Sequence, residues 1–167
     1  CERLLSAHDT LEFSVSVTTR SRRGDEVDGE NYRYVTEETF EAMKRDDAFA
    51  EWAEVHGNKY GTTIETIRTA WADGTDLLFD IDYQGAEQLK ARFPNCIAVM
   101  VVPPSMEVLK SRLVGRGTDS EEVVRARVDE ARHELQQYDL FDFIVENGEI
   151  ESAQEALNSI YVAARHR

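Results

Sequence analysis

The stretch LLFDIDYQGAEQLKARFPNCIAVMVV (77–102) carries the strongest signal for the fold of this chain. It opens with a compact apolar strand at 77–82, continues with a helix at 85–93 and returns to an apolar strand at 96–102. A strand, a helix and a second strand in this order favour a parallel sheet that helices cover on both sides. The stretch therefore predicts an α/β protein.

The sequence after this stretch continues the alternation of strands and helices. The expected elements are a helix capped by Ser105 and running to about Val114, a helix at about 120–137, a strand at 141–146 and a helix from about 150. Thr118 and Glu121 have the spacing of a capping box at the start of the long helix.

The sequence before residue 77 contains a region that breaks this rhythm. The expected elements are an alternating strand at 11–19, a short strand at 32–35, a helix capped by Thr36, a strand at 49–55 and a helix at about 63–72 that stops near Gly74. Strands at 32–35 and 49–55 do not belong to a regular strand–helix repeat. We therefore interpret 20–72 as an insertion into the α/β fold.

The composition bounds the class of protein. The chain has 167 residues, 41% of them apolar, and a formal net charge of −14, which fits one globular domain with a small inserted lobe. The acidic balance opposes nucleic acid and membranes as partners, because both are polyanionic, but it allows a small phosphate ligand at a local basic cluster. The longest apolar run, 96–102, is too short to span a bilayer. Cys1 and Cys96 form no metal-ligand spacing and no disulfide framework, which predicts a cytoplasmic protein.

A basic cluster follows the first alternating strand, in SVSVTTRSRRGDEVDGENYRY (14–34). Its candidate anion-binding residues are Ser16, Arg20, Arg23 and Tyr32. Their hydroxyl and guanidinium donors could close on one phosphate, because charge-assisted hydrogen bonds suit that ligand. The alternative is a solvated turn with surface arginines.

Glu51 and Thr62 are candidates for reading a purine base. Guanine presents two adjacent donors, N1–H and the 2-amino group, and one carboxylate can accept both, whereas adenine lacks that pair. Glu51 lies on a mostly apolar strand, which is unusual for a structural Glu. Glu54 lies close by on the same strand, so a structural role for both carboxylates stays open.

Asp80 and Asp82 fall at the carboxyl end of the strand at 77–82, where α/β folds bind ligands. An Asp at such a position can support Mg²⁺ through water beside nucleotide phosphates. The alternative is ordinary capping of the helix that follows.

Several arginines surround the Gly-containing loop at 115–119 and the helix after it. They are Arg112, Arg116, Arg125 and Arg127. Mobile arginines can close over phosphates and neutralise charge in a transition state. The alternative is that they are surface residues of their helices.

Taken in order, these segments resemble guanylate kinase. The resemblance covers essentially the whole chain, through SVSVTTRSRR, VDGENYRYV, EWAEVHGNKYGT, LLFDIDYQGA, VVPPS, RLVGRGTDSEE and FDFIVEN. It implies an enzyme of purine nucleotide metabolism that transfers the γ-phosphate of ATP to GMP, giving ADP and GDP. The implied cofactor is Mg²⁺, which enters with ATP, and the implied partners are the small molecules GMP and ATP. No protein partner is implied.

The resemblance also implies a role for each candidate residue. Ser16, Arg20, Arg23, Tyr32 and Tyr60 match the clamp on the GMP phosphate, and Glu51, Thr62 and Asp82 match residues that read guanine. Arg116 and Arg127 match lid arginines that reach the transferred phosphate, and Asn147, with Arg116, matches the ATP side. Asp80 matches an acidic position near Mg²⁺ that acts through water, so no direct metal ligand is expected. The residues expected to be catalytic are Arg20, Asp80, Arg116 and Arg127.

The implied fold is a P-loop NTPase-like three-layer core with a parallel sheet, an inserted GMP-binding lobe and a lid. The expected parts are a core at 1–19, 73–114 and 129–167, a lobe at 20–72 and a lid at 115–128. The family binds the ATP phosphates with a Gly-rich loop that ends in Gly-Lys-Ser/Thr, and this sequence contains no such motif. We expect the first strand and this loop to lie upstream of Cys1.

Two other functions stay open on the sequence. The first is a non-catalytic guanylate-kinase-like module that binds phosphopeptides at the same clamp; such relatives tend to lose the lid chemistry, whereas this chain keeps Arg116 and Arg127. The second is a kinase for a different nucleoside monophosphate, which the combination of Glu51 and Thr62 opposes.

Overall fold

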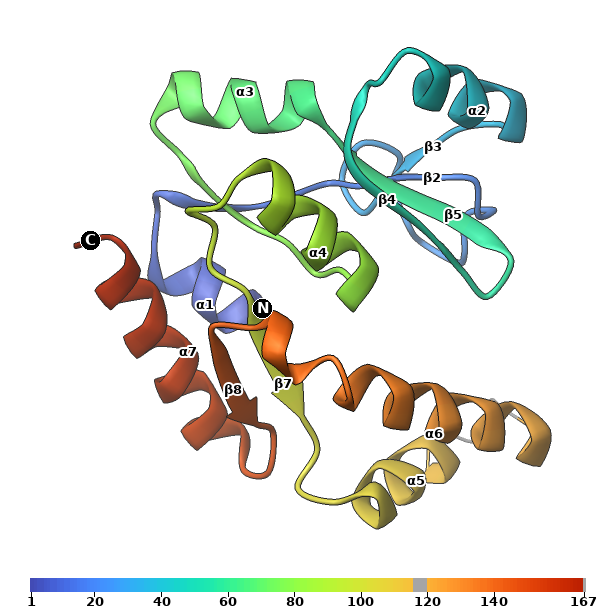
Figure 1. Cartoon of the computed structure of the whole chain (residues 1–167), viewed down its shortest axis with the longest axis vertical. Coiled ribbons are helices and arrows are strands. Elements are labelled where there is room, and N and C mark those ends of the chain that lie inside the picture. The colour runs from blue at the N-terminus through green and yellow to red at the C-terminus, as the bar shows by residue number, and fades with distance from the viewer. Residues whose placement is uncertain (116–119, 167) are drawn as a thin grey trace. The chain divides into compact units, whose positions relative to one another are not determined.

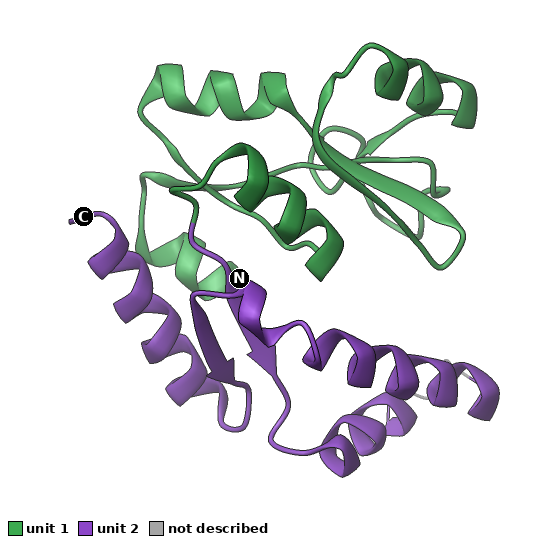
Figure 2. Ribbon diagram, in the orientation of Figure 1, with its two compact units in different colours: residues 1–96 green, residues 97–167 purple. Residues whose placement is uncertain are grey.

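The computed structural model describes residues 1–115 and 120–166. The chain forms two compact units, residues 1–96 and residues 97–167 (Figure 2). Each unit has its own pair of parallel strands with helices before and after them in the sequence (Figure 1).

The parallel pair of the first unit consists of β1 (Leu11–Phe13) and β6 (Asp76–Leu78). Helix α1 (Glu2–Ala7) packs on β1, and helix α3 (Ile64–Asp73) packs on β6. A buried cluster of Ala50, Ile67 and Leu89 is surrounded by apolar side chains of the β6 region. Because Leu89 belongs to helix α4 (Tyr83–Arg92), the cluster joins this helix to the parallel pair and to the second sheet of the unit.

That second sheet has four strands in the order β3-β2-β5-β4. The strands are β2 (Val17–Thr18), β3 (Arg33–Tyr34), β4 (Phe49–Val55) and β5 (Asn58–Thr63). β2 and β3 are parallel, whereas β5 runs antiparallel to β2 and to β4. Helix α2 (Glu37–Arg45) packs on this sheet through Phe40, whose ring stacks on Phe49 with 4.4 Å between centroids.

Local signals in the sequence set the ends of these helices. Thr36 begins α2 by accepting a hydrogen bond from the backbone N–H of Thr39 at 3.2 Å. Gly74 ends α3 in the left-handed conformation, with a φ of 70°. Both helix ends are confirmed as the sequence predicted them.

The second unit contains the parallel pair β7 (Val99–Val102) and β8 (Phe143–Glu146). Its helices are α5 (Met106–Gly115), α6 (Glu121–Leu135) and α7 (Ile150–Ala164), with a 3₁₀ turn η1 at Tyr138–Leu140. Leu113 on α5 packs with Val124 and Val128 on α6. Helix α7 packs on β8.

The structure corrects the expected strand at 11–19. β1 ends at Phe13 and pairs with β6, whereas β2 pairs inside the four-stranded sheet. One alternating pattern thus serves two sheets, and residues 14–16 carry the chain from one to the other. The expected strand at 77–82 is also shorter, since β6 ends at Leu78. Asp80 and Asp82 therefore lie in the segment between β6 and α4.

Two further details differ from the sequence-based expectation. β5 was not predicted, because NKYGTT (58–63) has no alternation of apolar residues and owes its strand geometry to pairing with β4. The cap of α6 is Ser120, whose hydroxyl accepts from the N–H of Val123 at 3.4 Å. Thr118, the expected cap, lies outside the described residues.

The α/β fold class is confirmed. Parallel strands alternate with helices along both units, and the inserted four-stranded sheet extends from Val17 to Thr63. In the part of the chain that the structure describes, no helix combines the length and apolar character needed to cross a bilayer.

Candidate functional site

A cavity of about 270 Å³ in the first unit brings together residues that are distant in the sequence. It lies among the 14–16 linker, strands β4 and β5, and the segment between β6 and α4. The lining residues are Ser16, Glu51, Ala53, Val55, Tyr60, Asp80, Ile81 and Asp82. All the hydroxyl and carboxylate groups in this lining belong to residues that the sequence singled out.

Glu51 is buried in the wall of the cavity, with a relative exposure of 3%. Its Oε1 accepts a hydrogen bond from the backbone N–H of Thr62 at 2.8 Å, across the β4–β5 pair. Burial raises the pKa of Glu51, and the nearby charge of Asp82 adds to the rise. No described Lys or Arg forms an ion pair with this carboxylate. It therefore has acceptor capacity to offer to a ligand that supplies donors.

Thr62 is fully buried, and its hydroxyl lies close enough to Glu51 to lower the pKa of that carboxyl without meeting it in hydrogen-bond geometry. Its Oγ1 has no hydrogen-bond partner among the described residues. A buried polar group left unpaired costs about 1–3 kcal/mol, so a ligand atom that reaches it would recover part of that cost. Thr62 is not itself a lining residue of the cavity, but its own backbone N–H holds Glu51.

Asp80 and Asp82 line the cavity from the segment between β6 and α4, whereas Glu51 lines it from strand β4. Asp82 caps α4, because its Oδ1 accepts from the N–H of Gly85 at 2.9 Å. The capping role is thus confirmed for Asp82, and the same residue also lines the cavity. Asp80 lines the cavity from the segment that follows β6.

Arg20 and two tyrosines form a cluster that reaches the cavity through Tyr60. The guanidinium carbon of Arg20 lies 5.1 Å from the centroid of the Tyr32 ring, and that ring meets Tyr60 edge to face at 5.9 Å. Burial raises the pKa of Tyr32, Tyr60 raises it further, and Arg20 opposes the rise. Arg20 itself is buried, and its guanidinium lies beside the rings of Tyr32 and Tyr34.

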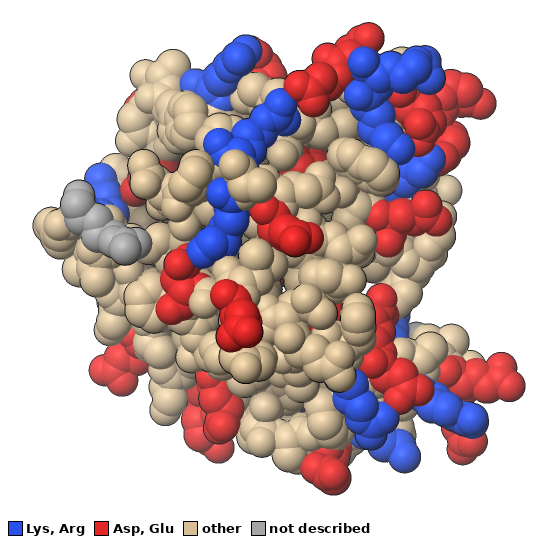
Figure 3. Space-filling model, viewed as in Figure 1, with Lys and Arg blue, Asp and Glu red and all other residues tan. Residues whose placement is uncertain are grey.

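Glu26 organises this cluster, and the sequence reasoning missed it. Its carboxylate accepts from Nη2 and Nη1 of Arg20 at 2.7 and 3.1 Å, from the N–H of Arg23 at 2.8 Å and from the hydroxyl of Tyr34 at 2.7 Å. The hydrogen bond from Arg20, then that from Tyr34, lowers the pKa of Glu26 to about 2. The position of this acidic residue inside a basic cluster was the sequence signal that could have identified it. Acidic and basic side chains are also interspersed over the face drawn in Figure 3.

The remaining candidates are placed less directly. Arg23 is exposed, and its backbone N–H joins the Glu26 cluster. Arg127 lies on α6 and Asn147 follows β8, both in the second unit, whereas Arg116 lies outside the described residues. Arg112 donates to the backbone carbonyls of Asn147 and Gly148 at 2.8 and 3.2 Å, which gives this arginine a structural role in the loop after β8.

The described residues contain no group of three or more His, Cys, Asp or Glu side chains arranged to hold a metal ion. Asp80 is the carboxylate that the sequence associated with Mg²⁺. Its oxygen donors and its place in the cavity wall fit a residue that contacts the water shell of a hard cation.

Comparison with known proteins finds one family that matches nearly the full chain. The family model of guanylate kinase matches residues 2–164. The guanylate kinase of Syntrophotalea carbinolica is 44% identical over 98% of this chain and 78% of its own length. That of Neisseria meningitidis serogroup A is 45% identical over 98% of this chain and 80% of its own.

A solved structure agrees with these sequence matches. The crystal structure of guanylate kinase from Anaplasma phagocytophilum matches with a TM-score of 0.83 and 29% identity, over 99% of this chain and 80% of that chain. The family model, the relatives and the solved structure all name guanylate kinase. The chain therefore belongs to the guanylate kinase family.

Proposed function

We propose that this chain transfers the γ-phosphate of ATP to GMP and releases ADP and GDP. The observation that carries the proposal is the buried Glu51 carboxylate, which no described cation neutralises and which faces a cavity. The N1–H and 2-amino groups of guanine supply the two donors that this carboxylate lacks, and adenine cannot supply them. Membership of the guanylate kinase family supports the same reaction.

The phosphate of GMP would occupy the side of the cavity where Ser16 and Tyr60 meet the Arg20–Tyr32 cluster. Glu26 and the Ser21 carbonyl accept three of the five N–H donors of Arg20, and the proposal assigns the other two, on Nε and Nη2, to the ligand. Arg23 is proposed to turn inward from its exposed position. A dianionic phosphate is thereby held by guanidinium and phenol donors within an acidic protein.

The transfer itself needs no covalent intermediate. A phosphate oxygen of GMP attacks the γ-phosphorus of ATP, and the bond from that phosphorus to the leaving oxygen of ADP breaks. Arg116 and Arg127 are proposed to neutralise the charge that builds up on the transferred group, and Asn147 to lie beside the adenine. Mg²⁺ bound with ATP would add charge neutralisation on the phosphates, with Asp80 oriented toward its water shell.

The proposal includes a division of labour along the chain. The core comprises 1–19, 73–114 and 129–167, the GMP-binding lobe comprises 20–72, and the lid comprises 115–128. The four-stranded sheet that carries Glu51 and Thr62 lies almost wholly inside the proposed lobe, which supports this division. The proposed setting is purine nucleotide metabolism in the cytoplasm, which membership of the guanylate kinase family supports.

Titration calorimetry of the purified protein with GMP, AMP, CMP and UMP tests the proposal. GMP should bind, and the other monophosphates should bind at least tenfold more weakly, because each lacks the adjacent donor pair that Glu51 requires. A coupled assay should show ADP formation that depends on GMP. Tighter binding of another monophosphate would reject the assignment of the base.

A further inference from the structure

Helix α4 supplies hydrogen bonds to the outer edge of strand β4. β4 is the last strand in the order β3-β2-β5-β4, so one of its edges faces no other strand of that sheet. Gln88 fills this edge at Trp52: its Oε1 accepts from the backbone N–H at 3.1 Å, and its Nε2 donates to the backbone carbonyl at 2.7 Å. The primary amide thus occupies the place of a neighbouring strand at the residue after Glu51.

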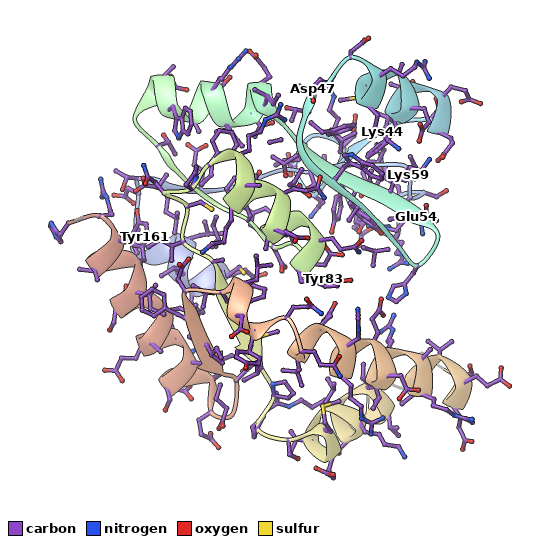
Figure 4. The ribbon with its side chains drawn as sticks, viewed as in Figure 1. Lys44, Asp47, Glu54, Lys59, Tyr83 and Tyr161 are labelled. Carbon is purple, nitrogen blue, oxygen red and sulfur yellow. The ribbon has the colours of Figure 1, made fainter. Side chains whose placement is uncertain are left out.

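Arg92 makes a second contact of this kind. Its Nη1 donates to the backbone carbonyl of Phe49 at 2.6 Å, and its Nη2 donates to Asp47 at 2.8 Å. Asp47 has a φ of 50° and lies in the turn before β4, where Figure 4 labels it. Glu51 is therefore bracketed by two backbone anchors, one at Phe49 and one at Trp52.

The two anchors differ in how they hold the strand. The side chains of Arg92 and Asp47 are 37% and 80% exposed, so solvent screens their ion pair. Gln88 makes two direct bonds to one residue in a partly buried place, and its Nε2 also donates to the carbonyl of Gln84 at 3.1 Å. Gln88 accordingly holds both the N–H and the carbonyl of Trp52, whereas Arg92 holds only the carbonyl of Phe49.

The same face of α4 also contacts the carboxylate. Gly85, Gln88 and Arg92 are spaced by three and four residues, which places them on one side of the helix. A Cβ at Gly85 would lie 2.7 Å from Oε2 of Glu51, so the helix backbone lies directly against this oxygen. Asp82 caps the helix and lines the cavity with Glu51. Helix α4 therefore controls the positions of both carboxylates.

We propose that Gln88 is a positioning residue that determines guanine selectivity, a role that rests on the proposed function. Gln88 is not a lining residue of the cavity and acts through Trp52 on Glu51. Its amide fixes the β4 backbone against α4, so that Glu51 and Asp82 keep the separation that one guanine base spans. A methionine at this position has a similar length and volume but can neither donate nor accept these bonds.

Inosine monophosphate provides the discriminating ligand. It keeps the N1–H of guanine and lacks the 2-amino group, so a well-placed Glu51 prefers GMP. A displaced Glu51 loses the geometry needed to accept both donors and keeps one contact with either ligand. The preference for GMP over inosine monophosphate therefore reports on the position of Glu51, whereas a purely structural role would weaken both ligands equally.

The test is titration calorimetry of GMP and inosine monophosphate with wild type, Gln88→Met, Gln88→Glu and Gln136→Met. Gln136 is an exposed residue at the end of α6, so its variant is the matched control. Gln88→Met should lower the preference for GMP by about tenfold, the effect of one good hydrogen bond, while Gln136→Met keeps it. Gln88→Glu can still accept from the Trp52 N–H but places an oxygen against its carbonyl, and it should lower the preference too.

Thermal unfolding followed by circular dichroism shows which variants fold, and Gln88→Glu carries the test if Gln88→Met does not fold. An unchanged preference in the folded variant overturns the role of Gln88. Glu51→Gln is titrated alongside to separate the positioning role of Gln88 from the proposed base reading by Glu51. If Glu51→Gln lowers the preference and Gln88→Met does not, only the positioning role fails; if Glu51→Gln also leaves it unchanged, the proposed base reading fails.

Discussion

Glu51 combines two properties that oppose each other at the scale of a single residue. Its burial destabilises the charged form, and the hydroxyl and then the backbone N–H of Thr62 offset only part of that effect. The proposed function nevertheless needs the carboxylate as an acceptor of two donors. Such a group lowers the stability of the free protein in order to recognise its ligand, which is the usual compromise at binding sites.

The first prediction concerns recognition by Glu51. Glu51→Gln should weaken GMP binding by about tenfold or more, because the amide can accept one donor but presents its own N–H to the other. Titration calorimetry with GMP and AMP measures the change. Glu54→Gln, an exposed position on the same strand that Figure 4 labels, is the matched control and should bind GMP as wild type does. Equal affinities of GMP for the Glu51 and Glu54 variants would contradict the assignment.

The second prediction concerns stability and pH. Because the pKa of Glu51 is raised in the folded state, the unfolded chain loses this proton at lower pH, and stability falls as pH rises through the interval between the two pKa values. Glu51→Gln removes this penalty. The variant should therefore be more stable than wild type at about pH 7, and this gain in stability should shrink toward about pH 4. Urea unfolding at both pH values measures it, and a gain that grows on acidification would show the opposite sign.

The third prediction separates neighbouring arginines. Arg23→Ala should weaken GMP binding by roughly 10- to 100-fold if its side chain joins the phosphate clamp, because a hydrogen bond to a charged group contributes about 1.5–3 kcal/mol. Arg22→Ala removes the same charge one residue earlier, from another exposed position. Comparable losses in both variants would indicate a general electrostatic effect and reject a specific clamp.

At the residue scale, the structure can be compared with the sequence-based prediction for the positions of the candidate residues. Ser16, Glu51, Tyr60, Asp80 and Asp82 are distant in sequence, and the structure collects them in one cavity. Glu26 had a signal in its place within a basic cluster, but its partners could not be predicted, because the path of the 20–34 loop brings the donors of Arg20, Arg23 and Tyr34 to one carboxylate. The roles of the cavity residues and of Glu26 in binding stay predictions until variants are measured.

At the scale of elements, the sequence of α4 includes a residue that lowers helix stability but leaves space beside the cavity. Glycine inside a helix costs about 1 kcal/mol relative to alanine, yet α4 has Gly85 in its first turn. The missing Cβ leaves room for Oε2 of Glu51, which lies 2.7 Å from the position that a Cβ would take. The close approach of helix and carboxylate therefore accounts for this glycine.

The fourth prediction follows from that contact. Gly85→Ala should improve the propensity of α4 and displace the Glu51 carboxylate, so GMP affinity should fall by at least tenfold while the helix content is kept. Calorimetry and far-ultraviolet circular dichroism measure the two effects on one sample. A variant that keeps wild-type affinity would show that Glu51 can move away without loss.

The elements themselves were predictable to different degrees. The helix capped by Thr36 and the strand at 49–55 follow from local signals, namely a capping hydroxyl and an apolar run, and both are confirmed. β5 could not be predicted, because its residues carry no apolar period and only the ladder with β4 makes them a strand. The division of 11–19 between two sheets was also hidden, since side-chain alternation does not reveal a change of partner.

At the scale of the whole molecule, the candidate residues are divided between the two compact units. The cavity, Glu51 with Thr62, and the Arg20 cluster lie in residues 1–96, whereas Arg127 and Asn147 lie in residues 97–167. The proposed function assigns the GMP contacts to residues of the first unit and assigns Arg127 and Asn147 of the second unit to the ATP side. The sequence resemblance implied parts of another kind, namely a core, a lobe and a lid, and the boundaries of these proposed parts cannot be derived from local patterns.

The fifth prediction uses that division. GMP alone should slow amide hydrogen exchange in the segments that build the cavity, residues 49–63 and 80–92, because a ligand stabilises the state that binds it and suppresses local opening. At labelling times of seconds to minutes, helix α7 should exchange at the same rate with and without GMP, since no proposed GMP contact lies in the second unit. Mass spectrometry of peptic fragments resolves these segments. Glu51→Gln is the control and should show much weaker protection at the same GMP concentration. Protection confined to residues 97–166 would move the GMP site to the second unit and overturn the assignment of the cavity.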